Sequence, residues 1–75
     1  MIKVTVKGER DFGLPGEYLE VDIMEPTLDS VMEYFNVNPK IRKHLFPVVN
    51  NQMCKQDRVL QNGDKILLQS PYSGG

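Results

Sequence analysis

The sequence predicts a single α+β domain, in which one main helix packs on one face of a mixed sheet of about four to five strands. Three observations predict this class. Two segments near the start alternate apolar and polar residues, one segment in the middle carries an apolar stripe at helical spacing, and a further alternating segment lies near the end. The chain has 75 residues, so we expect residues 1–75 to form one domain, with residues 71–75 as a flexible C-terminal tail.

The first third of the chain predicts two strands joined by a loop. Ile2–Lys7 alternates strictly and is β-branched on its apolar side, and Tyr18–Ile23 alternates again. Gly8–Gly16, which contains Gly13 and Pro15, is typical of a loop. We therefore expect an antiparallel hairpin with a long connection. The side chains expected to face the core are Ile2, Val4, Val6, Leu19, Val21 and Ile23.

The middle third predicts the main helix and a shorter second one. Thr27 is a favourable N-cap, and Pro39 disfavours helix at the residue before it, so the main helix is expected to end at Asn36 to Asn38. Proline at a first helical position also allows a short helix to begin at Asn38-Pro39. The residues expected to face the core are Leu28, Val31, Met32 and Phe35 in the main helix, and Ile41 and Leu45 in the short one.

Two short strands are expected after the helices. Phe46–Val49 and Gln52–Cys54 flank Asn50-Asn51, which accepts positive φ and suits a tight hairpin turn. The segment that follows is polar and irregular, and Leu60 is expected to lie under the sheet.

The end of the chain predicts a turn, a strand and a tail. Asn62–Asp64 has the residue types of a tight turn, because glycine reaches positive φ freely. Lys65–Ser70 alternates, with Ile66 and Leu68 on one face, and Pro71 ends the strand because it cannot donate to a ladder. The resulting order of strand, strand, helix, short strands and final strand matches that of ubiquitin-like β-grasp domains.

Composition and charge exclude several classes of function. The net charge is −1, with three basic and eight acidic residues in 1–35 and six basic and two acidic residues in 36–75, which gives −5 and +4. This segregation favours a complementary protein partner and does not predict nucleic-acid binding, which requires a clustered basic surface. No apolar run approaches the ~20 residues of a membrane span, so we expect a cytoplasmic protein without membrane contact.

No residue pattern predicts catalysis or a metal site. His44 is the sole histidine and Cys54 the sole cysteine, and neither has a neighbouring catalytic partner or metal-ligand spacing. We expect a surface or structural role for His44 and a small apolar role for Cys54. Lys40, Arg42 and Lys43 predict a solvated helix face, or else a contact with an acidic partner. The sequence therefore predicts a protein that is not itself an enzyme and that holds no cofactor.

The C-terminal segment Leu60–Gly75 has the pattern L-x-x-G-D-x-I-x-L-x-x-P-x-x-G-G. Together with Val48-Val49-Asn50-Asn51, it resembles the small β-grasp sulfur carriers, which include the small subunit of molybdopterin synthase and the thiamin-pathway carrier. Pro71 places the chain nearer the molybdopterin type, although Ser70-Pro71-Tyr72-Ser73 replaces that type's Pro-Pro-Val-like run.

The resemblance implies a chemical role for the tail. In that family an E1-like enzyme adenylates the terminal glycine, and a persulfide sulfur donor then replaces AMP to leave a thiocarboxylate. The family also docks on the large subunit of a biosynthetic synthase. Carried over, Gly75 is the modified residue, and Gly74, Ser73 and Tyr72 enter the partner's site. Three alternatives stay open: a modifier conjugated through Gly75, a thiamin-pathway carrier, and a plain interaction domain in which the glycines are incidental.

The strand pattern also predicts a docking face. With Ile66 and Leu68 inward, Leu67 points to the opposite face of the sheet, which it is expected to share with Tyr18 and Gln69. An apolar residue on an otherwise polar face is either an unremarkable exposed leucine or a contact for partner enzymes. We take Leu67, Tyr18 and Gln69 as the candidate docking residues.

Overall fold

The computed structural model describes residues 1–71, which form five strands, two α-helices and one 3-10 turn. In chain order, the elements are β1 (Ile2–Gly8), η1 (Arg10–Phe12), β2 (Leu19–Ile23), α1 (Leu28–Tyr34), α2 (Pro39–Arg42), β3 (Phe46–Val49), β4 (Gln52–Met53) and β5 (Lys65–Gln69). Each strand and helix expected from the sequence is present, and the predicted loop 8–16 contains the 3-10 turn.

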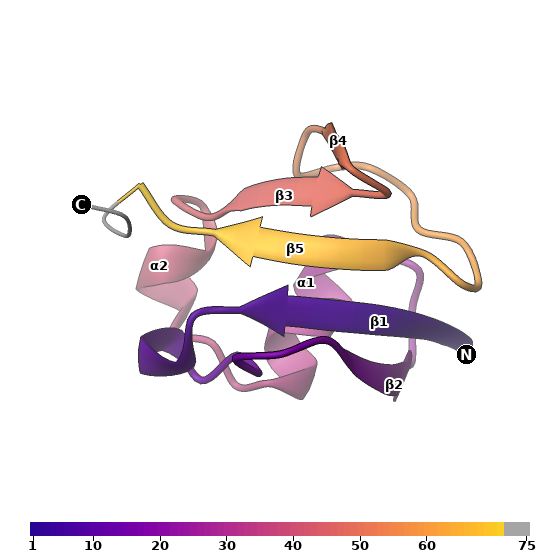
Figure 1. The fold of residues 1–75 in the computed structure, drawn as a ribbon, viewed down its shortest axis with the longest axis horizontal. Helices are drawn as coiled ribbons and strands as arrows, with labels where there is room; N and C mark the ends of the chain where they lie inside the picture. Colours follow the sequence, from indigo (N-terminus) through magenta and orange to yellow (C-terminus); the bar gives the residue numbers. More distant parts are fainter. Residues whose placement is uncertain (72–75) are drawn as a thin grey trace.

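The five strands form one mixed sheet in the order β2-β1-β5-β3-β4 (Figure 1). β1 and β5 are parallel, and the other neighbouring pairs are antiparallel. Figure 1 shows α1 behind the sheet and α2 beside the end at which β5 finishes. This arrangement confirms the predicted α+β class and is compatible with a β-grasp-like fold.

The helices begin at the predicted caps. The Thr27 side chain accepts a hydrogen bond from the Ser30 amide at 3.0 Å, which satisfies one of the free donors at the start of α1. Asn38 caps α2 in the same way, by accepting from the Lys40 amide at 2.9 Å, and Pro39 holds the first position of that helix. Asn36, with φ of 61°, ends α1 in the left-handed region that asparagine tolerates.

The core lies between the sheet and the helices and contains most of the residues predicted to face it. Ile2, Phe35 and Ile41 are partly buried and pack against it. The core also includes Leu14 and Val37, two residues from connecting segments that the periodic patterns did not place. Leu14 enters the core because Gly8 lets it approach, since a Cβ at position 8 would lie 2.5 Å from Cδ1 of Leu14. The buried apolar residues are Val4, Val6, Leu14, Val21, Ile23, Leu28, Val31, Met32, Val37, Leu45, Val49, Leu60, Ile66 and Leu68.

One predicted core residue is exposed, so that prediction was wrong. Leu19 pairs with Val6 and therefore shares the helix-facing side with Val21, yet 49% of its surface is exposed. The reason is position, because Leu19 is the first residue of a strand at the edge of the sheet. Alternation sets the side of a strand to which a residue points, but it does not set what covers it.

A buried carboxylate joins the ends of several strands. Asp64, 6% exposed, accepts hydrogen bonds from the Asn50 side-chain amide at 2.9 Å and from the Gln61 amide at 2.8 Å. The backbone oxygen of Asp64 accepts from the Thr5 amide at 2.9 Å. Asn50 also accepts from the Lys65 amide at 3.0 Å. Asp64 therefore connects the β3–β4 turn, β1 and the start of β5.

We expect Asp64→Ala to lower the free energy of unfolding by about 1–2 kcal/mol, because it leaves the Asn50 amide and the Gln61 amide without their acceptor. Urea titration followed by circular dichroism measures this change. Asp57→Ala is the matched control, since Asp57 is exposed and should change stability by less than about 0.5 kcal/mol. Equal stability of the two variants would contradict a structural role for Asp64.

Candidate functional site

The base of the predicted tail is the central strand of the sheet. β5 lies between β1 and β3, and its last residue, Gln69, pairs with Phe46. Ser70 is buried, and Pro71 is exposed. The predicted tail residues Tyr72, Ser73, Gly74 and Gly75 lie outside the described residues. The structure therefore defines the strand that precedes this segment in the chain.

The predicted docking residues lie on the face of the sheet that carries no helix, which we call the open face. Leu67 is half-buried there, between Ile66 and Leu68, which are buried on the helix side. Gln69 is exposed on the same face, because it lies two residues farther along the strand.

The third predicted residue, Tyr18, lies just before β2, and two lysines surround its ring. The Lys65 amine is 4.4 Å from the ring centroid, and the Lys7 amine is 5.5 Å from it. Both distances allow cation–π attraction. Lys7 also pairs with Leu67, so a lysine lies between Leu67 and Tyr18 in the sheet.

Three further apolar residues, which sequence reasoning did not place on this face, extend it in the other direction. Val48 pairs directly with Leu67 and with Met53, and Phe46 lies two residues before Val48. Phe46 and Met53 are 46% and 74% exposed. Their alternation with Pro47 and Val49 in the sequence indicates that Phe46 and Val48 share one face of a strand, but only the register of β3 with β5 shows that this face adjoins Leu67. We call Phe46, Val48, Met53 and Leu67 the open-face patch.

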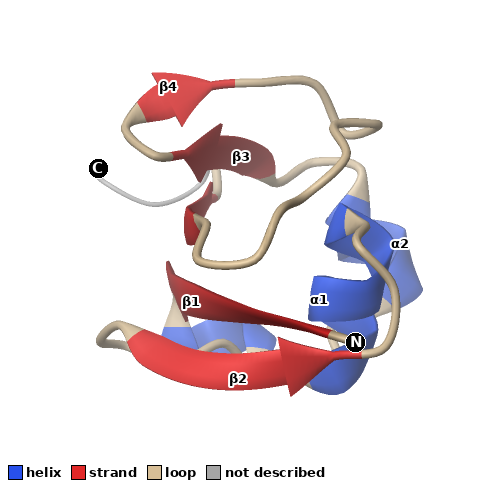
Figure 2. Ribbon diagram, turned by 90° about the vertical axis from the view of Figure 1, so that its right-hand side faces the viewer, coloured by secondary structure: helices blue, strands red, loops and turns tan. Residues whose placement is uncertain are grey.

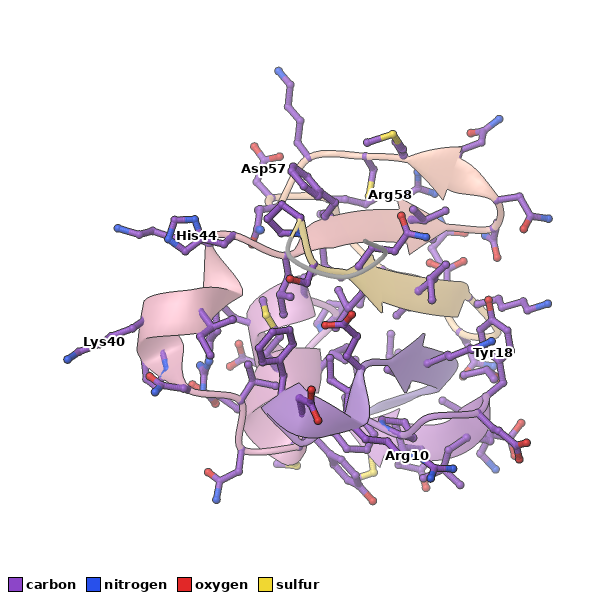
Figure 3. All side chains as sticks on the ribbon, turned by 60° about the vertical axis from the view of Figure 1, so that its left-hand side comes forward. Arg10, Tyr18, Lys40, His44, Asp57 and Arg58 are labelled. Carbon is purple, nitrogen blue, oxygen red and sulfur yellow. The ribbon has the colours of Figure 1, made fainter. Side chains whose placement is uncertain are left out.

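The basic residues at α2 have two different roles. The Arg42 Nε donates to the Val37 oxygen at 2.9 Å, and Nη1 lies 3.8 Å from Glu33, so Arg42 is largely structural. Lys40 and His44 project away from the body of the molecule, far from Tyr18 (Figure 3). Lys43, like these two, is exposed.

The segment that contains Lys40, Lys43 and His44 lies at the end of the sheet where β5 finishes. His44 and Leu45 lead directly into Phe46, the residue that pairs with Gln69. Figure 1 shows α2 next to this end of the sheet. Exposed positive charge therefore lies beside the end of β5.

The structure also places Cys54, the sole cysteine of the sequence. Cys54 is half-buried against the core, with its sulfur 3.8 Å from the Pro47 oxygen. Within residues 1–71, no group of three or more histidine, cysteine, aspartate or glutamate side chains is placed to hold a metal ion. The helices described in residues 1–71 are too short and too polar to cross a bilayer.

No family model matches this chain, and neither the curated proteins nor the solved structures contain a significant match to it.

Proposed function

We propose that this chain is a sulfur carrier of the β-grasp type. In this function the carboxyl group of Gly75 is activated and converted to a thiocarboxylate, which supplies sulfur for the synthesis of a cofactor. Molybdopterin is the cofactor that we propose first. In the first step, the carboxylate attacks the α-phosphate of ATP and releases pyrophosphate, which gives an acyl-adenylate. The terminal sulfur of a persulfide then displaces AMP and forms a C–S bond to the acyl group. A thiol cleaves the S–S bond that the persulfide brought with it, which leaves a disulfide on the donor side and frees the thiocarboxylate. Partner enzymes supply these steps, and this chain supplies the acyl group that carries the sulfur.

The observation that carries the proposal is the position of β5 relative to the two glycines. β5 pairs along its length with β1 and β3, so it is a rigid base, and Gly74-Gly75 follows its last residue by five and six positions. Glycines lack a Cβ, so a segment that ends in two of them can enter an active-site cleft too narrow for other residues. The resemblance of Leu60–Gly75 to the sulfur carriers adds the chemistry of activation.

The open-face patch supports the same proposal. Because Phe46 pairs with Gln69, the patch reaches the end of β5 from which the tail leaves. A partner that covers the patch is therefore in position to receive the tail. Apolar residues of this size are the usual anchors of protein interfaces, whereas the lysines beside Tyr18 would lie at the rim.

The proposal predicts a change of mass at Gly75. Intact-protein mass spectrometry of the chain purified from its native host first establishes that the polypeptide ends at Gly75. After incubation with ATP, a sulfur donor and host extract, we expect a gain of about 16 mass units at that residue, from the exchange of oxygen for sulfur. An unmodified mass after this incubation would overturn the sulfur-carrier function. A branched peptide that joins Gly75 to a lysine would instead establish a protein modifier.

Deletion of Gly74-Gly75 is expected to abolish sulfur transfer, because it removes the carboxyl group that would carry the sulfur. A melting curve checks that the deletion variant is folded. The measurement is formation of the sulfurated product in an extract that lacks the wild-type chain. Full activity of the deletion variant would favour the plain interaction domain, in which the glycines are incidental.

Leu67→Asp is expected to weaken binding to the adenylating enzyme at least about tenfold, because it places a charge in the apolar contact. Phe46→Asp tests the newly found part of the patch and should have a comparable effect. Asp29→Ala is the control, since Asp29 is exposed on α1, behind the sheet. Isothermal titration calorimetry measures the affinities, and a melting curve checks that each variant is folded. Unchanged affinity for both patch variants would remove this patch from the interface.

A further inference from the structure

The sheet has one edge long enough to bind another strand. Of its two edge strands, β4 has two residues and β2 has five. β2 is the lowest strand in Figures 1 and 2, and Figure 2 shows that it runs toward α1. An exposed strand edge presents a row of unpaired backbone donors and acceptors, which is a template for an added strand.

The hydrogen bonds of β1 identify which backbone groups of β2 face outward. The Thr5 amide donates to the Asp64 oxygen at 2.9 Å, and the Lys3 oxygen accepts from the Gly63 amide at 2.7 Å, so both residues turn their backbone groups toward the β5 side. In an antiparallel pair, a residue and its partner both face inward or both face away. The partners Glu20 and Asp22 therefore direct their N–H and C=O groups out of the sheet.

A groove lies beside this edge. It has a volume of ≈ 600 Å³ and runs between the end of β2 and the outer side of α1. Four acidic residues line it, and no basic residue does. Two exposed apolar side chains, Met24 and Tyr34, also line it and are 74% and 55% exposed. The four acidic residues are Asp22, whose side chain points to the open face, and Glu25, Asp29 and Glu33.

The charges decide what kind of strand fits this edge. A second copy of the chain paired edge to edge would place carboxylates opposite carboxylates, and like charges directly opposite each other are destabilising. Two basic residues lie near these acidic side chains, and both contacts are long. The amine of Lys3 is 3.9 Å from Glu20, and Nη1 of Arg42 is 3.8 Å from Glu33, whose side chain is 72% exposed. The edge thus repels its own copy and attracts a basic segment.

The exposed side chain of Leu19 also fits an added strand. Leu19 lies on the helix side of β2, where it lacks a covering neighbour at the outer edge. In a strand added at this edge, every second side chain would lie next to Leu19 and over the groove. The side chains between them would point to the open face, near Glu20 and Asp22.

From these observations we propose that the outer edge of β2, together with the groove beside α1, binds an extended basic segment of a partner protein, which adds to the sheet as a sixth strand. Backbone hydrogen bonds to Glu20 and Asp22 hold the segment, the carboxylates select lysine or arginine, and Met24, Tyr34 and Leu19 contact its apolar side chains. This surface is separate from the open-face patch, and it acts without Gly75.

The probe is a synthetic peptide of about seven residues in which lysine alternates with valine, a period-2 pattern suited to a strand. Two matched peptides serve as controls: one with glutamate in place of lysine, and one with N-methyl groups on alternate amides, which removes half of the strand hydrogen bonds. We expect the lysine peptide to bind, and to shift and protect the backbone amides of Glu20 and Asp22 in NMR spectra. Both controls should bind at least about tenfold more weakly.

Two pairs of variants test the two components of the site. Asp22→Pro removes both the carboxylate and the outward N–H of residue 22, an N–H that does not bond to β1. Edge strands tolerate proline at such a position. Asp22→Ala removes the carboxylate and keeps the N–H. The proline variant should bind the lysine peptide several-fold more weakly than the alanine variant. The double variant Asp29→Lys with Glu33→Lys should bind at least about tenfold more weakly than wild type. Asp57→Lys, an exposed charge change outside the groove, should bind within about twofold of wild type.

Any of three results would overturn the proposal: no binding of the lysine peptide, equal binding of the N-methylated peptide, or amide shifts that map away from β2 and α1. Equal binding by the N-methylated peptide would mean attraction by charge alone. Because the peptides and variants leave Gly75 intact and require no ATP, failure here is distinguishable from failure of the sulfur-carrier function.

Discussion

The parallel pairing of β5 with β1 is the constraint on which the rest of the structure depends. It joins the two ends of the chain, as the bond from the Lys3 amide to the Asn62 side chain, 59 positions apart, illustrates. Parallel neighbours cannot be joined by a tight turn, so the intervening helices and strands form the crossover and supply the layer that covers one face of the sheet. The central position of β5 follows from this pairing and from its second partner, β3.

Asp64 stabilises this constraint at its starting point. The carboxylate accepts hydrogen bonds from Asn50 and Gln61, while its backbone oxygen meets β1, so three segments are held where β5 begins. A buried carboxylate is costly unless its oxygens have hydrogen-bond donors, and here both have one. The start of β5 is therefore well defined, and so is the strand that leads to the two glycines.

The two faces and the edge of the sheet have different chemistry. The helix side holds the buried core, the open face carries the patch around Leu67, and the outer edge of β2 borders an acidic groove. In the proposed function, the apolar patch next to the end of β5 contacts the partner that modifies Gly75. An acidic edge with unpaired backbone groups suits an extended basic segment instead. Most acidic residues belong to the first half of the sequence, which forms β2 and α1. The uneven charge along the sequence therefore appears in the structure as an acidic surface beside these two elements.

The sequence by itself determined the local elements, because alternation, helical spacing, caps and turn residues act over a few neighbours. It therefore predicted the α+β class, the positions of the strands and helices, and the outward direction of Leu67. Only the tertiary structure decided what lies beside each element. It left Leu19 exposed at an edge, brought Leu14 from a loop into the core, and aligned Phe46 and Val48 with β5 to extend the open face. These outcomes depend on register and strand order, which arise from contacts between residues far apart in the chain and leave no local pattern to detect.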